Sequence, residues 1–456
     1  MNNRPIQLAI LGLGTVGTGV VELLQNNLDE MTRRTGREIK ITHVGTRRNR
    51  TDIPTDIKQS ADLLDIVQQD DVDIVVELMG GTTTAKEVIL AAIEHGKHIV
   101  TANKALLAEH GNEIFAKADA NGVKVAYEAA VAGGIPIIKI LREGLAANKI
   151  DWLAGIINGT GNFIMTEMRD KKRDFADVLA EAQALGYAEA DPTFDVEGID
   201  AAHKLTLLAS IAFGIPLQFD KVYCEGITKI TKQDVRYANE LGYRIKHLGF
   251  AKRRILDSGE EGIELRVHPT LIPKQVLLAN VNGVKNAIMV DAEPVGQTLY
   301  YGSGAGAGAT ASAVMADVVD MVRALAETND STANLVPHLA FQPETLNNTR
   351  ILSSDEMITG YYLRLQVKDD LGVLAEVTRI LSESKISIDA ILQQPAHDDT
   401  STDLPVIIMV DPVVERNMNE AIAKIEALDT VTDKVVRIRL DELMPVSYTH
   451  LRAHET

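Results

Sequence analysis

Cysteine, aromatic residues and long apolar runs are all scarce in this chain. One residue of 456 is cysteine (Cys224), and aromatic residues make up 4%. A lone cysteine excludes an intrachain disulfide and a paired-cysteine zinc site, and it suits a reducing compartment. No apolar run approaches the roughly 18 residues that a membrane span needs. The start, MNNRPIQLAILGLG, lacks the pattern of a secretory signal peptide, so we expect a cytoplasmic protein without a membrane span.

Positively charged residues are also scarce relative to acidic ones. Lys and Arg total 46 against 64 Asp and Glu, which gives a net charge of −18. Binding to a nucleic-acid backbone needs clustered Lys and Arg, so the composition argues against a nucleic-acid partner. The hydrophobic fraction of 45% and the charged fraction of 24% are ordinary for a globular protein. The length suffices for two or three domains.

Short apolar runs alternate with amphipathic stretches over the first 135 residues. Strands that are apolar nearly throughout and alternate with helices are typical of a parallel sheet covered on both faces. Residues 1–135 are therefore predicted to form a Rossmann-like, doubly wound α/β domain. We expect its strands at 6–12, 39–45, 72–79, 98–103 and 123–131, and its helices at 15–30, 83–95 and 105–120.

The pattern of predicted strands and helices changes in the second part, residues 136–326, where long helical segments separate the strands. Strands are expected at 150–157, 221–227, 262–270 and 285–291. This order indicates an α+β domain, to which we assign substrate binding and dimerisation. The glycine-rich run YGSGAGAGAT (301–310) opens a helix that we expect, near 309–326, to pack back on the first domain.

A third unit is predicted over residues 351–441, after a polar linker at 327–350. Its expected elements follow the order strand, helix, strand, strand, helix, strand, which is the βαββαβ order of a ferredoxin-like sandwich. The last residues, 442–456, have neither an amphipathic period nor an apolar anchor. We expect them to be disordered or non-native.

Gly12, Gly14 and Gly17 form the pattern G-L-G-T-V-G. The pattern is weak by itself, but here it follows a predicted strand and opens a predicted helix, as dinucleotide binding requires. Gly12 allows a tight turn, Gly14 lets backbone N–H groups approach a pyrophosphate, and Gly17 permits close helix packing. The alternative is a glycine turn that binds nothing.

The second predicted strand ends in THVGTRRNR, without the acidic residue that binds the adenosine ribose of NAD. Arg47 and Arg48 stand there instead, and arginine suits the 2′-phosphate of NADP. We therefore expect NADP(H) as the preferred cofactor. If both arginines are only solvated loop charges, NAD(H) remains open.

The stretch GYAEADPTFDVEGIDAAHKL (186–205) concentrates carboxylates ahead of an apolar helix. Asp200 and Lys204 are four residues apart and therefore share one helical face, where the lysine is a candidate proton-transfer group. The stretch fails the calcium-loop template. A solvated loop is the remaining alternative, and it explains Asp191 and Glu197 better than the acids beside the apolar run.

Two further segments carry candidate residues. Lys104, in TANKALL (101–107), follows a strand at its carboxyl end, where doubly wound sheets bind ligands; a surface lysine is the alternative. EAAVAGGIP (128–136) offers carbonyls and the Glu128 carboxylate to a hard cation, but a simple tight turn explains it better from sequence alone.

Together these motifs resemble homoserine dehydrogenase. The resemblance runs from about residue 5 to 440 and rests on GLGTVG, ELMGG, TANKALL, AAVAGGIP, NGTGNFI, the acidic stretch and YGSGAGAGAT. It implies NAD(P)H-dependent interconversion of L-aspartate 4-semialdehyde and L-homoserine in threonine, methionine and isoleucine biosynthesis. It also implies that the third unit is an ACT domain and that the form is monofunctional.

The resemblance assigns roles to residues. It makes Lys204 the acid/base residue and places Lys104 beside the nicotinamide and the reacting oxygen. It places the substrate against Glu189, Asp195 and Asp200. It adds Thr15, Val16 and Gly306 to the cofactor site. It also implies a sodium ion (Na⁺) held at Glu128 and by the carbonyls of Val131, Gly133 and Ile135.

Regulation and assembly are further implications of the resemblance. Gly372 lies at a strand-to-helix turn near the family's amino-acid pocket, which predicts L-threonine inhibition through the ACT domain; an ACT domain used only for assembly is the alternative. We expect a homo-oligomer, either a dimer or a tetramer. Rival functions are another NAD(P)-dependent semialdehyde dehydrogenase and a non-catalytic sensor that binds the cofactor without turnover.

Overall fold

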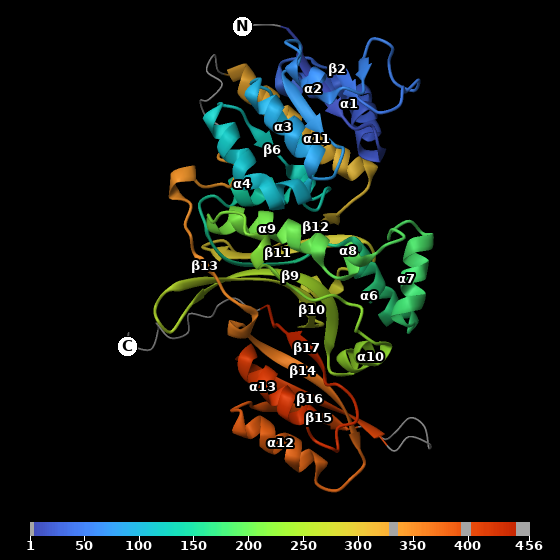
Figure 1. Ribbon diagram of the computed structural model, residues 1–456, viewed down its shortest axis with the longest axis vertical. Helices are drawn as coiled ribbons and strands as arrows, with labels where there is room; N and C mark the ends of the chain where they lie inside the picture. The colour runs from blue at the N-terminus through green and yellow to red at the C-terminus, as the bar shows by residue number, and fades with distance from the viewer. Residues whose placement is uncertain (1–3, 328–335, 394–402, 444–456) are drawn as a thin grey trace. The chain divides into compact units, whose positions relative to one another are not determined.

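The computed structural model describes residues 4–327, 336–393 and 403–443, which fall into two compact units (Figure 1). Residues 328–335 of the predicted linker (327–350) and residues 444–456 of the predicted tail (442–456) lie outside the described residues. In the described part of the chain, no helix combines the length and the apolar character that crossing a bilayer would need. The first unit comprises Met1–Gly159, Ile199–Val222 and Val284–Thr349, and the second comprises Thr160–Gly198, Tyr223–Gly283 and Arg350–Thr456.

A six-stranded parallel sheet is the centre of the first unit. Its strand order, β3-β2-β1-β4-β5-β6, is that of a doubly wound dinucleotide-binding fold, so the predicted fold class is confirmed. The strands are β1 (Ile6–Leu11), β2 (Ile39–Gly45), β3 (Lys58–Ser60), β4 (Ile74–Glu77), β5 (His98–Thr101) and β6 (Val125–Ala126).

The last of these strands is much shorter than the predicted strand at 123–131. The chain leaves the sheet in a 3₁₀ turn at Glu128–Ala130. The backbone N–H of Glu128 donates to Asp317 Oδ2 at 2.8 Å, so a side chain replaces the neighbouring strand as its acceptor. The prediction of a long strand was wrong here because an apolar run alone does not reveal such a side-chain acceptor.

Helices cover this sheet, and one of them comes from late in the chain. The helix expected near 309–326 is α11 (Ala307–Glu327), and it lies along α1 in Figure 1. Val314 and Val318 of α11 share one buried core with Val20 of α1 and with Leu8 and Ile10 of β1. The other helices of the unit are α1 (Thr15–Thr35), α2 (Leu63–Gln68), α3 (Thr83–Glu94), α4 (Lys104–Ala120), α5 (Ile137–Lys139) and α9 (Ile199–Phe213).

The first unit also contains an antiparallel three-stranded arrangement. β7 (Lys149–Ile156) pairs with β11 (Lys285–Glu293), which pairs with β12 (Gly296–Ser303). The sequence predicted β7 and β11 but missed β12. None of the residues of β12 is fully buried, so its polar and aromatic residues show no clear apolar alternation.

The second unit is built on two long antiparallel strands, β9 (Tyr243–Ile255) and β10 (Glu261–Pro273). β9 was not predicted, because it buries Lys246 and His247 among its apolar residues and so lacks a two-residue period. β10 also pairs with the short strands β8 (Tyr223–Cys224) and β13 (Arg350–Ile351). The helices here are α6 (Gly159–Lys171), α7 (Phe175–Ala184), α8 (Thr193–Val196) and α10 (Lys232–Glu240).

The predicted βαββαβ order of the third region is confirmed. It runs β14 (Ile358–Lys368), α12 (Val373–Glu383), β15 (Ile388–Gln393), β16 (Asp403–Val414), α13 (Glu415–Glu426) and β17 (Val436–Leu440). One face of this sheet packs on α12 and α13. The other face contributes Tyr362, Met409 and Ile438 to a core that includes Phe163 of α6 and Val235 of α10. The ferredoxin-like region therefore shares a core with the rest of the second unit.

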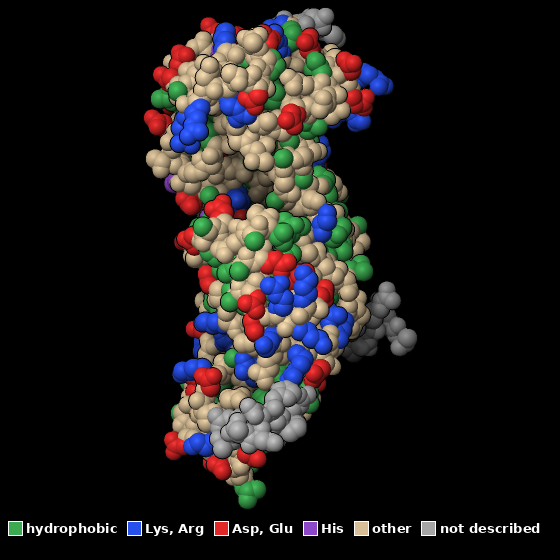
Figure 2. Space-filling view, turned by 90° about the vertical axis from the view of Figure 1, so that its right-hand side faces the viewer, with side chains coloured by type: hydrophobic (Ala, Val, Ile, Leu, Met, Phe, Trp, Pro, Cys, Tyr) green, Lys and Arg blue, Asp and Glu red, His purple; other side chains and the backbone are tan. Residues whose placement is uncertain are grey.

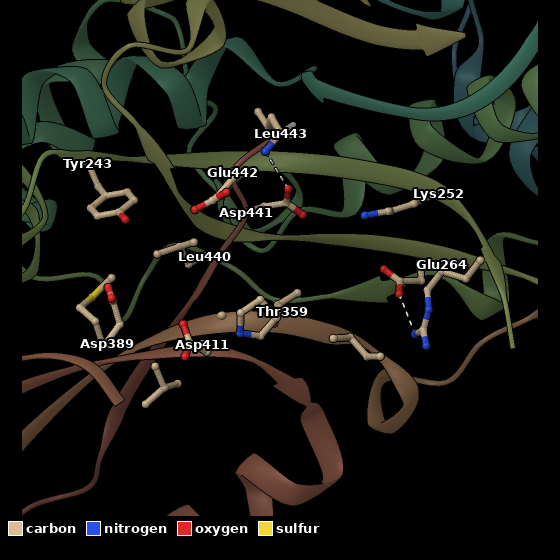
Figure 3. Close-up of a pocket in the computed structure, with 16 residues that line it drawn as sticks. Tyr243, Lys252, Glu264, Thr359, Asp389, Asp411, Leu440, Asp441, Glu442 and Leu443 are labelled. Atoms are coloured by element: carbon tan, nitrogen blue, oxygen red, sulfur yellow. Dashed lines mark hydrogen bonds and ion pairs between the residues drawn. The ribbon is translucent and has the colours of Figure 1, made fainter. Parts of the chain in front are cut away.

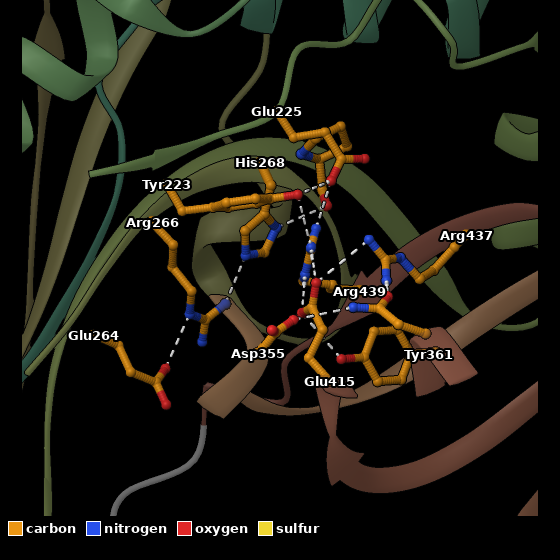
Figure 4. A network of polar contacts seen from close by, with 12 residues as sticks. Tyr223, Glu225, Glu264, Arg266, His268, Asp355, Tyr361, Glu415, Arg437 and Arg439 are labelled. Carbon is orange, nitrogen blue, oxygen red and sulfur yellow. Dashed lines mark hydrogen bonds and ion pairs between the residues drawn. The ribbon is translucent and has the colours of Figure 1, made fainter. Parts of the chain in front are cut away.

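A buried polar network also ties this region to the rest of the second unit (Figure 4). Arg439 of β17 donates to Glu415 of α13, to Glu225 Oε2 at 2.6 Å and to the Tyr223 hydroxyl at 2.9 Å. Arg439 is 1% exposed. Because a buried charge is costly unless it is paired, these contacts hold β17 to the segment around β8.

Candidate active site

The glycine loop between β1 and α1 has one position that is left open. A Cβ at Gly12 (φ +102°) would lie 2.8 Å from the Leu78 carbonyl oxygen, and one at Gly17 would lie 2.1 Å from the Gly12 carbonyl oxygen. A Cβ at Gly14 would meet nothing within 4 Å. Gly12 and Gly17 are thus required by the turn itself, whereas Gly14 leaves free space over the backbone.

The start of α1 is suited to an anion. Gly14 caps the helix without a side-chain hydrogen bond, and the first turn, which begins with Thr15 and Val16, contains no acidic residue. Unsatisfied N–H groups at such a terminus attract phosphate. Gly306 (φ +117°), directly before α11, likewise has open space at its Cβ position. The loop therefore fits the pyrophosphate of a dinucleotide.

Arg47 and Arg48 are exposed in the loop after β2, where the sequence places them. The arginine that contacts the glycine loop is a third one, Arg50, which was not predicted. Its Nη1 donates to the Leu13 carbonyl oxygen at 2.7 Å, and its guanidinium pairs with Asp52 at 2.5 Å. The stretch THVGTRRNR already contained Arg50, but charge alone could not separate it from its neighbours.

Lys104 is the first residue of α4, at the carboxyl end of β5. Thr101 Oγ1 accepts the backbone N–H of Asn103 at 3.0 Å, and the Asn103 side chain in turn accepts the backbone N–H of Leu106 at 3.2 Å. The Asn103 amide also donates to the Gly81 carbonyl oxygen at 2.7 Å. This capping fixes where the helix begins, and hence where Lys104 projects.

Asp200 brings the two predicted lysines together. Its Oδ2 accepts from Lys204 Nζ at 2.6 Å, and its Oδ1 lies 3.2 Å from Lys104 Nζ. Asp200 is 5% exposed, and the side chains of Lys204 and Lys104 are 12% and 31% exposed. The structure thus joins residues about a hundred positions apart in one charged cluster that remains open to solvent on the lysine side.

The segment 157–158 completes this cluster, and the sequence assigned it no role. Lys204 Nζ donates to the Ile157 carbonyl oxygen at 2.7 Å, and Asn158 Nδ2 donates to Asp200 Oδ2 at 2.9 Å. Asn158 opens the motif NGTGNFI, which helped to identify the family resemblance. The polar residues of this motif were the only sequence signal of a role in the site. Only the fold shows that Asn158 contacts Asp200.

The charges in the cluster stabilise one another. Burial would raise the pKa of the Asp200 carboxyl, but the ammonium groups of Lys204 and Lys104 outweigh that effect. With hydrogen bonds from Lys204 and Asn158, they hold the pKa of Asp200 well below its usual range. Burial, followed by the charge of Lys104, lowers the pKa of the neighbouring His203 to about 4. Near neutral pH the cluster therefore contains an ionised Asp200 beside a neutral imidazole.

Glu128 lies at the predicted cation segment, and its carboxylate is already engaged. Its two oxygens accept the backbone N–H groups of Ile138 and Lys139 at 2.9 and 2.8 Å. Burial and the nearby Asp317 raise the pKa of Glu128 to about 8. Val131, Gly133 and Ile135 belong to the same buried turn, and a Cβ at Gly133 would lie 3.2 Å from Thr310 Oγ1.

Glu189 and Asp195 belong to the second unit, whereas Asp200 and both lysines belong to the first. Glu189 is exposed, and its carbonyl oxygen accepts from Gln183 Nε2 at 3.0 Å. Asp195 is half-buried in the short helix α8. Their assignment to substrate binding remains a prediction.

A cavity of about 500 Å³ lies wholly within the second unit (Figure 3). Its lining combines carboxylates such as Asp389, Asp411 and Glu442 with Lys252 and Arg254. Burial and the charges of Asp389 and Glu442 raise the pKa of Tyr243, which also lines it. None of the predicted catalytic, cofactor or substrate residues lines this cavity.

A doubly wound sheet with an open glycine loop, together with a partly buried lysine–carboxylate cluster, is the arrangement expected of a dinucleotide-dependent oxidoreductase. Family models agree with this class. The homoserine dehydrogenase NAD-binding domain matches residues 12–128, homoserine dehydrogenase itself matches 136–319, and the ACT domain matches 361–429.

Individual relatives are similar over nearly the whole chain. The homoserine dehydrogenase of Pseudomonas aeruginosa is 59% identical over 96% of this chain and 100% of its own length. That of Corynebacterium glutamicum is 40% identical over 96% of each chain. The crystal structure of a homoserine dehydrogenase from Thiobacillus denitrificans superposes with a TM-score of 0.90 at 56% identity, covering 97% of this chain and 99% of that one.

The chain therefore belongs to the homoserine dehydrogenase family, whose members are oxidoreductases. A hyperthermophilic archaeal homoserine dehydrogenase solved in complex with NADPH shares the fold, with a TM-score of 0.60 and 24% identity. It covers 72% of this chain and 99% of that one.

Proposed function

We propose that this protein interconverts L-aspartate 4-semialdehyde and L-homoserine with NADP(H) in the cytoplasm, in the biosynthesis of threonine, methionine and isoleucine. Family membership and the Lys204–Asp200–Lys104 cluster support the reaction. The exposed Arg47 and Arg48, with no acid at the end of β2, support NADP(H) over NAD(H).

The single observation behind the mechanism is that Asp200 contacts both Lys204 and Lys104. The contacts of Lys204 then show what it can still bind. Two N–H groups of the Lys204 ammonium are used by Asp200 and by the Ile157 carbonyl oxygen. An ammonium has three donors, so one remains for the oxygen of a substrate. Because Asp200 stays ionised, it holds Lys204 in place and keeps a negative charge beside it.

In the reducing direction the residues act on the substrate oxygen. Bound NADPH would supply a hydride to the aldehyde carbon. As charge develops on the oxygen, Lys204 or Lys104 donates a proton to it, and both ammonium groups stabilise the alkoxide. Glu189, Asp195 and Asp200 are proposed to bind the substrate ammonium, which orients the aldehyde.

The reaction is tested by following NADPH oxidation with purified protein and L-aspartate 4-semialdehyde, with NADH in a parallel assay. Succinic semialdehyde, which lacks the amino group, is the matched control substrate. We expect turnover with aspartate semialdehyde, a higher kcat/KM with NADPH than with NADH, and little turnover of the control. Cofactor binding without turnover would indicate a sensor instead, and equal turnover of both aldehydes would indicate a different dehydrogenase.

We also propose a bound Na⁺ at Glu128, held by the carbonyls of Val131, Gly133 and Ile135. The support is family membership and the burial of this segment, in which Glu128 is 5% exposed; carboxylate and carbonyl oxygens are the ligands that hard cations prefer. The cation would offset the charge repulsion between the Glu128 and Asp317 carboxylates. Thermal unfolding in sodium chloride and in tetramethylammonium chloride of equal ionic strength tests this, and equal midpoints would contradict it.

We propose that L-threonine inhibits the enzyme through the ACT domain, and membership of the homoserine dehydrogenase family supports this. Gly372 (φ +92°) caps α12, and Leu371 beside it is fully exposed. Removing residues from 350 onward would uncover the core shared with α6 and α10, so a point substitution is the better test. Gly372→Ala should weaken inhibition by L-threonine while basal activity is retained, and unchanged inhibition would refute this site.

We also propose a homo-oligomer, which a mass measurement in solution tests.

A further inference from the structure

A positively charged groove lies within the second unit, outside every site described above. It has a volume of about 870 Å³ and is formed by the end of α6, by α10 and by the start of β9. Lys and Arg side chains gather on the face of the protein shown in Figure 2, the side on which α7 and α10 lie in Figure 1. The cations that line the groove are Arg169, Lys172, Lys232, Arg236 and Arg244.

Acidic residues neutralise only part of this charge. Two carboxylates line the groove: Asp170, which pairs with Arg169 at 2.7 Å, and Glu240, which lies 3.7 Å from Arg236. Three more cations than carboxylates therefore face the groove. Outside it, Asp174 pairs with Lys232 at 2.9 Å, but both side chains are more than half exposed, where ion pairs are weak. The whole chain has a net charge of −18, so this excess of positive charge is local.

The cations are also close enough to affect one another. Burial, followed by the charge of Arg169, lowers the pKa of Arg244. Two residues after Arg244 on β9, Lys246 is 1% exposed, and burial together with the charges of Arg169 and Arg244 lowers its pKa to about 7. Like charges held together in a partly buried place destabilise the fold. An anion in the groove would remove this repulsion.

Helix-end electrostatics explains only part of the arrangement. Arg169 lies in the last turn of α6, where the helix dipole favours cations. That effect does not account for Arg236 on α10 or Arg244 on β9, which face the same space from other elements. The convergence of three elements on one hollow is what distinguishes this groove from an ordinary charged surface.

We propose that the groove binds an organic anion that carries phosphate or carboxylate groups. Guanidinium groups suit both kinds of group. Arg169 donates two N–H groups to Asp170, and Arg244 donates from Nη1 to the Asn239 side chain, so an anion would be bound by their other N–H groups. Met168 and Val235, which are 1% and 7% exposed and belong to the core beneath, form the apolar floor of the groove. The volume is within the range of small-molecule sites, roughly 300–1,000 Å³. The site is independent of the dehydrogenase reaction.

Isothermal titration calorimetry on the full chain tests the proposal with pyrophosphate, ATP and citrate as separate probes. NADP⁺ is kept saturating, so that the glycine loop is occupied, and the ionic strength is kept near 0.15 M to screen non-specific attraction. Pyrophosphate and ATP report on phosphate recognition, whereas citrate reports on carboxylate recognition. We expect at least one probe to bind at a single site per chain.

The double variant Lys232→Gln/Arg244→Gln should weaken that binding at least about tenfold. The matched control is Arg379→Gln/Lys434→Gln, which removes two exposed, ion-paired cations elsewhere in the second unit and should bind as the wild type does. Thermal unfolding shows whether each variant is folded, and the exposed single change Lys232→Gln replaces the double variant if that one fails. Absence of binding by all three probes, or equal binding by the groove and control variants, would overturn the proposal.

Discussion

Asp200 joins two lysines from different helices: its Oδ2 is 2.6 Å from Lys204 Nζ and its Oδ1 is 3.2 Å from Lys104 Nζ. Lys204 is one turn further along the same helix, whereas Lys104 begins α4. One buried carboxylate thus sets the spacing of both candidate proton donors. The proposed proton transfer depends on this relationship.

Asp200→Asn keeps the shape of the side chain and removes its charge. Two lysines would lose their shared counterion, so we expect kcat to fall by about 10²-fold or more while the Kd for NADPH is unchanged. Breaking a buried ion pair typically costs about 3–5 kcal/mol of unfolding free energy, which urea unfolding measures. Glu113→Gln, in an exposed pair with Lys86, is the matched control and should change neither quantity. Wild-type kcat in Asp200→Asn would exclude the proposed role.

Two glycines of the fingerprint should respond differently to alanine. At Gly17 the new Cβ meets the Gly12 carbonyl oxygen at 2.1 Å, so Gly17→Ala should lower both the unfolding free energy and NADPH affinity. At Gly14 the Cβ meets nothing within 4 Å, so Gly14→Ala should keep the wild-type unfolding free energy and lose affinity for NADPH, by about tenfold or more. Thermal unfolding and fluorescence titration separate the two effects. Unchanged NADPH affinity in Gly14→Ala would place the pyrophosphate elsewhere.

Cofactor choice is assigned to the exposed arginines after β2. Arg47→Ala/Arg48→Ala should raise the KM for NADPH by about tenfold or more and leave the KM for NADH nearly unchanged, because only NADPH has the 2′-phosphate. Arg33→Ala/Arg34→Ala removes two exposed arginines from the end of α1 and serves as the control. A selective loss for NADPH in Arg50→Ala alone would instead assign the 2′-phosphate to Arg50.

His98 should make stability depend on pH. Its Nδ1 accepts the backbone N–H of Lys124 at 3.0 Å, and burial lowers its pKa to about 4. Unfolded histidine titrates near pH 6.5, so its contribution is present above pH ~6.5 and is lost as the pH falls toward 4. The loss amounts to about 3 kcal/mol.

His98→Asn retains an acceptor for Lys124 but does not titrate. Urea unfolding between pH 4 and 7 should therefore show a flatter dependence in this variant than in the wild type. The exposed His95→Asn is the matched control and should keep the wild-type slope. An unchanged slope in His98→Asn would contradict the assignment.

Much of the fold was predictable because its signals are local. Strand β1, the glycine turn and the start of α1 follow one another in the sequence, and the βαββαβ region alternates regularly. The sequence did not predict β9, because this strand buries Lys246. Lys246 donates to the Val281 carbonyl oxygen at 2.5 Å, and Val281 is 35 residues away in the sequence. Such a partner is visible only after folding.

The contacts within the candidate active site were predictable only in part. Lys204 and Asp200 could be paired from helical spacing, and Lys104 from its place at a strand end. The contact between Lys104 and Asp200, and the support from Asn158, depend on tertiary structure that no spacing rule contains. Arg50 shows the same limit, since its contact with Leu13 joins segments 37 residues apart.

The most direct test of the account is the turnover of Lys204→Ala with L-aspartate 4-semialdehyde and NADPH, beside Lys104→Ala and the wild type. We predict that Lys204→Ala lowers kcat by roughly 10²- to 10⁴-fold while NADPH binding, measured by titration, stays at the wild-type value. A kcat near that of the wild type would contradict the assignment of Lys204 as the residue that transfers the proton.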